Sequence, residues 1–244
     1  MKNYKFCLLL LPFALSSCKK PAKETSTPIE FPTTSYTYLG AYDDQGKPIL
    51  LEKDVISASL NDNIKATLPE HINITTTHPE FIKDADLVIT TKSDVYITFV
   101  SERTGFSNSI GYYMYKTGSP PVKPADIQNV NFIFPNASSN DGGTLMSGDK
   151  VKLGTFDPGV SIGFVLLNNG WDKVAKVVNK NAPHFCSAKV LNPEDNIQLK
   201  PHTILFNYSA ENKVMIGFED TDRSLPECDD DFNDEVIYAT FVAK

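Results

Sequence analysis

The sequence predicts an all-β fold, a jelly-roll-like β-sandwich with one short N-terminal helix. Apolar and polar residues alternate with a period of two in short runs such as 95–100 and 160–166, which is the pattern of half-buried strands. Clusters of Gly, Pro, Asn and Asp separate the runs, for example at 117–124 and 135–143. Many short strands joined by such turns are typical of sandwiches. Further apolar runs lie at 111–115, 130–134, 203–208, 214–218 and 236–242.

The segment 36–80 is expected to form a hairpin followed by the helix, ahead of a sandwich domain over 81–244. The hairpin would span 36–52 and turn at Asp43-Asp44-Gln45-Gly46, a sequence rich in turn formers. The helix is predicted by apolar residues that recur every four positions until Pro69 ends the pattern. These residues are Ile56, Leu60, Ile64 and Leu68.

The first residues have the features of a sorting signal. Lys2 and Lys5 accompany an apolar run over 6–15, which is too short for a permanent membrane helix of about 20 residues and indicates a cleaved leader. Two serines precede Cys18, a sequence that resembles a lipobox. We therefore expect a lipoprotein signal peptide over 1–17 and acylation (palmitate) at Cys18. An ordinary secretory signal is the alternative.

Residues 18–35 are expected to form a lipid-anchored flexible tether. They are rich in Pro, Thr, Ser and charge, a composition that cannot bury enough apolar surface to order itself. In enteric bacteria an Asp after the lipidated cysteine retains a lipoprotein at the inner membrane, and here that residue is Lys19. The outer membrane is therefore favoured, with the periplasmic face and the cell surface both open.

Composition limits the partners. The formal net charge is −7, and losing Lys2 and Lys5 with the leader makes it −9, so nucleic acid is not an expected partner. Cleavage and acylation leave two cysteines, Cys186 and Cys228. In an oxidising compartment these can form a disulfide, and two free thiols are the alternative.

An acidic stretch over 217–235 carries the chemistry. Carboxylates crowded between two strands repel one another unless solvent screens them or a cation lies among them. Asp229, Asp231 and Asn233 alternate, as the first three ligands of a calcium loop do. The pattern is not an EF-hand, because the sixth position is Asp234 and the twelfth is Thr240.

Hard oxygen donors favour Ca²⁺ over zinc or iron, and a solvated acidic turn is the alternative. Phe232 is expected to point inward and hold the loop against the core. The predicted metal ligands are Glu219, Asp220, Asp229, Asp231, Asn233 and Asp234.

The chain resembles a family of LruC-type bacterial lipoproteins that carry a domain of unknown function 4114. The matching segments lie within 102–115, 132–149, 161–171, 192–194 and 217–234, so the resemblance covers roughly 84–242. It implies a β-rich, surface-associated protein with a calcium-binding-like acidic motif, and it implies no enzymatic activity. The long loop 221–227 departs from the family pattern and leaves the ligand set open.

Three functions compete. The first is a lipid-anchored surface module, binding or structural, that holds Ca²⁺. The second is a calcium-assisted glycan-binding module in which aromatic rings stack on sugars, although aromatic strands more often pack in a core. The stacking candidates are Tyr113, Tyr115 and Trp171. The third, a hydrolase using Glu219 and Asp231, is disfavoured because the sequence does not separate their environments. The expected partners are the membrane and a surface glycan or protein.

Overall fold

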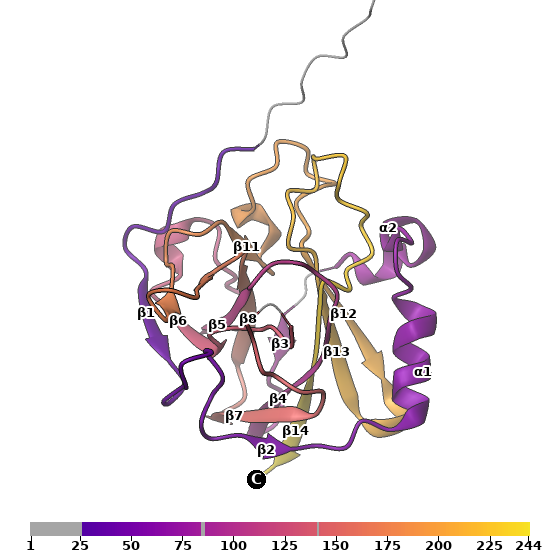
Figure 1. The fold of residues 1–244 in the computed structure, drawn as a ribbon. Coiled ribbons are helices and arrows are strands. Elements are labelled where there is room, and N and C mark those ends of the chain that lie inside the picture. Colours follow the sequence, from indigo (N-terminus) through magenta and orange to yellow (C-terminus); the bar gives the residue numbers. More distant parts are fainter. Residues whose placement is uncertain (1–25, 84–85, 141) are drawn as a thin grey trace, which may run out of the picture.

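The computed structural model describes residues 26–83, 86–140 and 142–244 (Figure 1). The predicted signal peptide, the acylation at Cys18 and the tether up to residue 25 lie outside these residues. The last part of the predicted tether is not free: the Phe31 ring is buried and stacks on His184 with centroids 4.6 Å apart. The segment from Ser26 onward therefore belongs to the body, because Phe31 gains an apolar contact that composition alone does not reveal.

Two six-stranded sheets form the described part of the molecule, which confirms the all-β sandwich. The first sheet has the order β1 (Ser35–Tyr38), β6 (Asn129–Phe134), β5 (Ser109–Lys116), β8 (Val160–Leu167) and β11 (His184–Cys186), with β3 (Leu87–Val88) also paired to β8. The second has the order β12 (Thr203–Tyr208), β13 (Lys213–Phe218), β14 (Glu235–Ala243), β4 (Ser93–Glu102), β7 (Asp149–Phe156) and β2 (Glu52–Lys53). A small ribbon joins β9 (Trp171–Asp172) to β10 (Val177–Val178).

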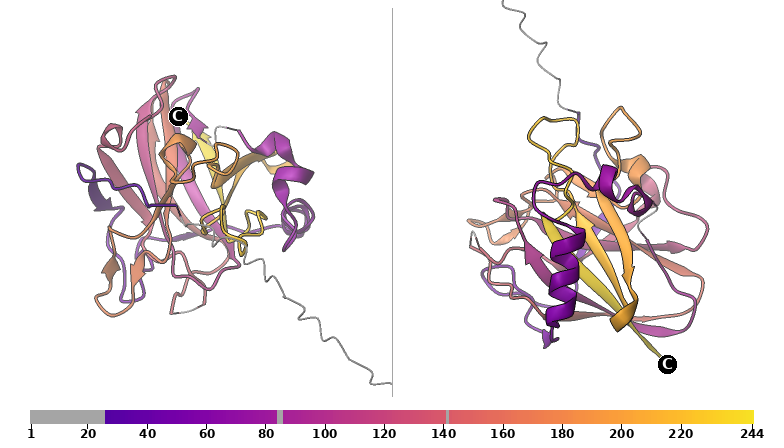
Figure 2. Two further views of the ribbon diagram at one scale, coloured as in Figure 1. Left: turned by 90° about the horizontal axis from the view of Figure 1, so that it is seen from above. Right: turned by 90° about the vertical axis from the view of Figure 1, so that its right-hand side faces the viewer.

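The helical part is small. α1 (Ala58–Thr67) begins after Ser57, whose side chain caps it by accepting a hydrogen bond from the Leu60 amide. Its apolar side, the predicted four-residue repeat, packs on the outer face of the second sheet (Figure 2). Short turns follow as α2 (Ile74–Thr77) and the 3₁₀ segments η1 (Pro79–Phe81), η2 (Pro124–Asp126), η3 (Lys189–Leu191) and η4 (Ser209–Glu211). No helix among the described residues is long and apolar enough to cross a membrane.

The predicted N-terminal hairpin is present only near its turn, where Tyr42 and Pro48 form an antiparallel bridge. Asp43 does organise the turn, since its carboxylate accepts hydrogen bonds from the amides of Gln45 and Lys47. The two arms separate, because β1 pairs in parallel with β6 of the first sheet while β2 pairs with β7 of the second. Residues 36–80 are thus part of the sandwich and not a unit placed before residue 81.

Three apolar layers hold the sheets. The central layer, between the sheets, includes Phe99, Phe164 and Phe218. A second layer around Phe132 and Trp171 lies under the loops on the first sheet. The third layer fills the space between α1 and the second sheet, and it contains Phe232 of the acidic loop. Helix packing and loop position are therefore coupled through one cluster.

Truncating Leu60 to alanine tests this coupling. Leu60 is fully buried in the third layer, so Leu60→Ala should lower the free energy of unfolding by about 2–5 kcal/mol through lost burial and a cavity. Val55, which is 82% exposed, provides the control: Val55→Ala should change it by less than about 0.5 kcal/mol. Urea unfolding followed by circular dichroism measures both. Equal effects would contradict the packing of α1.

Candidate metal centre

The acidic loop, residues 219–234, joins β13 to β14 at one end of the sandwich. The chain just after α1 lies against it, in agreement with Figure 1, where α2 and the yellow loop share one end of the molecule. The Ile74 amide donates to the Asp230 carbonyl over 2.8 Å, and the Asn73 side chain donates to the Asp230 carboxylate over 2.9 Å. Segments about 160 positions apart in sequence thus build one site.

Two anchors fix the conformation of this loop. Phe232 is fully buried, as predicted, although its φ of 54° lies in the left-handed region that non-glycine residues rarely occupy. Its amide donates to Glu219 Oε1 over 2.9 Å. Arg223, also buried, donates from Nε to Asp230 Oδ1 over 2.6 Å and from Nη1 to the Pro201 carbonyl over 2.9 Å. One arginine charge is thereby committed to one loop carboxylate.

Four residues bring potential ligand atoms together in an outer cluster, defined here as Glu70, His71, Asp229 and Asp231. One ligand atom from each lies within 4.8 Å of the others. His71 Nδ1 is 2.6 Å from Asp229 Oδ2, and the His71 amide donates to Asp231 Oδ2 over 2.8 Å. His71 holds this position with a φ of 58°, an unusual backbone state for a residue with a side chain.

The structure divides the predicted ligand set. Asp229 and Asp231 converge as expected, and Glu70 and His71, which sequence reasoning missed, join them. The amide of Asn233 is turned away, since its Nδ2 donates to the Leu68 carbonyl over 3.3 Å. His71 is distant from the acidic loop along the chain but adjacent to Asp229 in space. The sequence feature that could have pointed to His71 is its position two residues after Pro69, where the predicted helix ends.

Glu219 lies behind the outer cluster in a more buried environment. Its Oε2 accepts from the Cys228 thiol over 3.1 Å. Burial, followed by the charges of Asp231 and Asp229, raises the pKa of Glu219 to about 8. Burial also raises the pKa of Asp231 to about 6, against the hydrogen bonds from the His71 and Asn233 amides. Both carboxyls favour a proton or a cation over an isolated negative charge.

Asp220, which is buried, and Asp234, which is half-buried, occupy a separate position beside Glu219. The Asp220 amide donates to Asp234 Oδ2 over 2.9 Å, and Asp220 Oδ2 accepts from Asn108 Nδ2 over 2.7 Å. Burial, then the charges of Asp220 and Glu219, raises the pKa of Asp234 to about 10. These two predicted ligands are therefore bonded to each other and are not part of the outer cluster.

The two cysteines are free in the structure, so the disulfide alternative is wrong and the free-thiol alternative holds. Cys186 is buried on β11, and burial raises the pKa of its thiol well above the usual range. Cys228 lies in the acidic loop and donates to Glu219. The number of cysteines alone could not predict that one lies on β11 and the other in the acidic loop.

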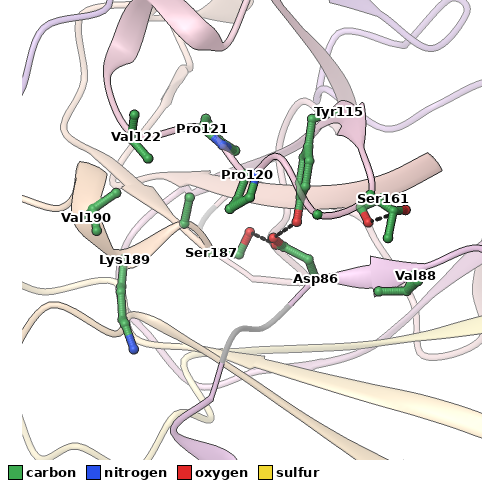
Figure 3. A pocket seen from close by; sticks show the side chains of 13 residues that line it. Asp86, Val88, Tyr115, Pro120, Pro121, Val122, Ser161, Ser187, Lys189 and Val190 are labelled. Carbon is green, nitrogen blue, oxygen red and sulfur yellow. Dashed lines mark hydrogen bonds between the residues drawn. The ribbon is translucent and has the colours of Figure 1, made fainter. Parts of the chain in front are cut away.

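The predicted glycan-stacking residues do not form a shared surface. Tyr113 and Trp171 are 2% and 3% exposed, so their rings serve the core and this part of the prediction is wrong. Tyr115 alone lines an open pocket of about 300 Å³ (Figure 3). There the Asp86 carboxylate lies between the hydroxyls of Tyr115 and Ser187, with Pro120 and Val122 along the wall (Figure 3).

The raised pKa values predict how stability depends on pH when chelator removes divalent ions. The folded protein keeps a proton on Glu219 up to a pKa of about 8, whereas the unfolded chain releases it near 4.5. The free energy of unfolding should therefore fall as pH rises from 6.5 to 8. Buried His184 has the opposite effect on the free energy of unfolding, because burial lowers its pKa to about 4. That effect falls between pH 4 and 6.5, below this window.

Replacing Glu219 isolates its contribution to the pH dependence of stability. Glu219→Gln keeps an acceptor for the Phe232 amide and should flatten the slope between pH 6.5 and 8, as measured by urea unfolding in EDTA. A residual slope is expected in both proteins from Asp234, whose pKa burial raises to about 10, and from His71, whose pKa is raised first by its hydrogen bond to Asp229. Identical slopes in the two proteins would refute the assignment to Glu219.

Comparison with known families gives one match. A family model for a domain of unknown function, DUF4114, matches residues 156–242, which runs from the end of β7 to the end of β14 and includes the whole acidic loop. The expected resemblance from residue 84 onward is supported only over this shorter range. Neither the curated proteins nor the solved structures gave a match. Residues 156–242 of the β-sandwich are therefore similar to this domain of unknown function.

Proposed function

We propose that this protein binds Ca²⁺ through the outer cluster of its C-terminal acidic loop and acts as a lipid-anchored surface module. The single observation that carries the proposal is the convergence of four ligand atoms, from Glu70, His71, Asp229 and Asp231, to within 4.8 Å of one another. Three of the four donors are carboxylates. Carboxylate oxygens are the ligands that Ca²⁺ prefers, and it accepts irregular geometry.

The exposure of the cluster supports a binding role. The Glu70 side chain is 39% exposed and Asp229 is 35% exposed, so one side of the cluster faces solvent. Ca²⁺ takes 6–8 oxygen ligands, which is more than these residues supply. Positions left to water are positions that an oxygen atom of a partner can occupy. A surface glycan or an acidic protein segment both have suitable oxygens.

His71 raises zinc as the competing ion, because imidazole nitrogen suits Zn²⁺. Calcium is favoured since the imidazole is 76% exposed and can move away while the carboxylates remain. His71→Ala separates the two: it should leave Ca²⁺ binding within a few-fold of the native protein. A zinc site would instead lose most of its affinity. Isothermal titration with each ion distinguishes them.

The thermal stability of the full chain tests the calcium proposal. A ligand that binds only the folded state stabilises by mass action, so free Ca²⁺ at 100 times Kd should raise the free energy of unfolding by about 2.7 kcal/mol. EDTA should reverse this. Asp229→Asn should remove most of the gain, whereas Asp157→Asn, at a 73% exposed carboxylate outside the cluster, should retain it. A melting temperature that does not change on adding Ca²⁺ would refute the proposal.

The anchor is part of the same proposal. It is supported by the apolar run over 6–15 that precedes Cys18. Ser26 adds a position for the anchored end, because its amide donates to Asp222 in the acidic loop over 2.9 Å. Eight peptide steps of about 3.3–3.6 Å each keep that contact within about 30 Å of the acylated residue. The acidic loop would therefore lie at the end of the body nearest the membrane.

Substitution of Cys18 tests the anchor. Cys18→Ala should abolish incorporation of labelled palmitate, because the acyl chains attach through that thiol, and it should shift the protein from the membrane pellet to the soluble fraction. Cys228→Ala serves as the control and should leave both properties unchanged. Membrane association that survives Cys18→Ala without label would contradict a lipid anchor.

A further inference from the structure

An open pocket beside the first sheet shares no residue with the outer cluster. It is bounded by β3, by the ends of β5 and β8, by the loop that follows β5 and by η3. Its volume of about 300 Å³ is at the lower end of the range of small-molecule sites, about 300–1,000 Å³. We name it the Asp86 pocket and define it by Asp86, Tyr115, Pro120, Val122, Ser187 and Val190 (Figure 3).

Exposed apolar side chains line its walls. Pro120 and Pro121 belong to the lining, and Val88, Val122 and Val190 are 51%, 69% and 45% exposed there. Single apolar residues scattered over a surface are ordinary, but these gather around one hollow. A ligand that covers them removes apolar surface from water, which is favourable. The walls therefore favour a ligand with an apolar body.

The Asp86 carboxylate provides the charge of the pocket. It is half-buried, and its two oxygens accept hydrogen bonds from the hydroxyls of Tyr115 and Ser187 (Figure 3). Lys189 is the one basic residue among the described lining residues, and its ammonium group points away from Asp86 in Figure 3. A carboxylate has about four lone-pair sites, so bonds to two hydroxyls do not exhaust its capacity to bind a donor.

The hydrogen bonds behind Asp86 hold it in its ionised form. The Ser187 hydroxyl donates to Asp86 and in turn accepts from the Phe164 amide over 2.8 Å and from the Tyr113 hydroxyl over 3.0 Å. The Tyr113 oxygen itself accepts from the Ala188 amide over 3.1 Å. Every donor in this chain is directed toward the carboxylate, which favours its charged form. The pocket therefore presents a negative charge among apolar walls.

We propose that the Asp86 pocket binds an organic cation, a primary ammonium group carried on an apolar stem. An ammonium group has donors and no acceptor, whereas an ionised carboxylate only accepts, so the two match. The stem would lie against Pro120 and Val122. An uncharged sugar fits less well, because its hydroxyls would lose hydrogen bonds to water against the apolar walls.

Two sources carry this chemistry. One is a free organic amine, and the other is the lysine side chain of a partner protein, which has an apolar four-carbon stem ending in an ammonium group. Both would place the charge at Asp86 and the stem at the valines. The proposal is independent of the calcium function, because the pocket and the outer cluster use different residues.

Isothermal calorimetry at pH 7 tests the recognition of charge, on the full chain in detergent with protein-free micelles as the baseline. Phosphate buffer is used because Tris is itself a primary amine. The probes are phenethylamine, its neutral counterpart phenethyl alcohol and the anion hydrocinnamate. The amine should bind about tenfold more tightly than the alcohol, through a charge-assisted hydrogen bond, and the anion should not bind. Equal affinity for amine and alcohol, or no binding of the amine, would overturn the proposal.

Replacing Asp86 tests the residue. Asp86→Asn keeps the shape of the side chain and removes its charge, so the affinity for phenethylamine should fall about tenfold, to that of the alcohol. Asp44→Asn is the control, because Asp44 is an exposed carboxylate paired with Lys176 outside the pocket, and it should bind like the native protein. An Asp86→Asn protein that is folded by circular dichroism and binds the amine with native affinity would contradict the assignment.

A charge added at the wall provides a second test should Asp86→Asn fail to fold. Val122 is exposed, so Val122→Lys leaves the core intact, and its cation should repel the ammonium group. The affinity for phenethylamine should fall several-fold while that for the alcohol is unchanged. Val174→Lys adds the same charge at a 93% exposed valine outside the pocket and should alter neither. Equal amine affinities in these two variants would overturn the proposal.

A capped lysine, Nα-acetyl-lysine methylamide, distinguishes the two sources in the same titration. An affinity comparable to that of phenethylamine would support the proposal with a lysine side chain of a partner protein as the ligand. Binding of phenethylamine without binding of the capped lysine would support it with a free organic amine as the ligand.

Discussion

The repulsion among carboxylates at one end of the sandwich is the constraint on which this structure depends. Glu219, Asp231 and Glu235 are all almost completely buried there, and the charge of Arg223 is committed to Asp230. Removing a carboxylate from water costs several kcal/mol unless a counter-charge or hydrogen bonds replace the solvent. The surplus of negative charge is the reason to expect protons or cations as part of the folded state.

The surrounding elements hold these charges together despite their repulsion. Phe232 is inserted in the apolar layer under α1, so the loop cannot swing outward without exposing a buried ring. Non-glycine residues with positive φ at Asp230 and Phe232 indicate that packing determines the loop conformation at some local cost. The segment after α1 then closes the loop from outside through the amides of His71 and Ile74.

Local pattern was sufficient to predict most of the fold, and contacts between distant segments were not predictable. The four-residue repeat predicted α1 and the two-residue alternation predicted β4 and β8, because each pattern records which side chains are buried. The meeting of His71 with Asp229 depends on how α1 packs, and the pairing of Glu102 with Glu235 depends on strand register. Neither contact produces a recognisable pattern in the neighbouring sequence. The burial of Tyr113 and the parallel pairing of β1 with β6 were missed for the same reason.

A crystal structure of the protein grown with Ca²⁺ tests the central claim most directly. The account predicts density for an ion within about 2.3–2.6 Å of carboxylate oxygens from Asp229 and Asp231, with an anomalous signal that chelator abolishes. Asp229 and Asp231 oxygens that point separately into solvent, with only water between them at saturating Ca²⁺, would contradict it. The acidic loop would then be a solvated turn on a β-sandwich.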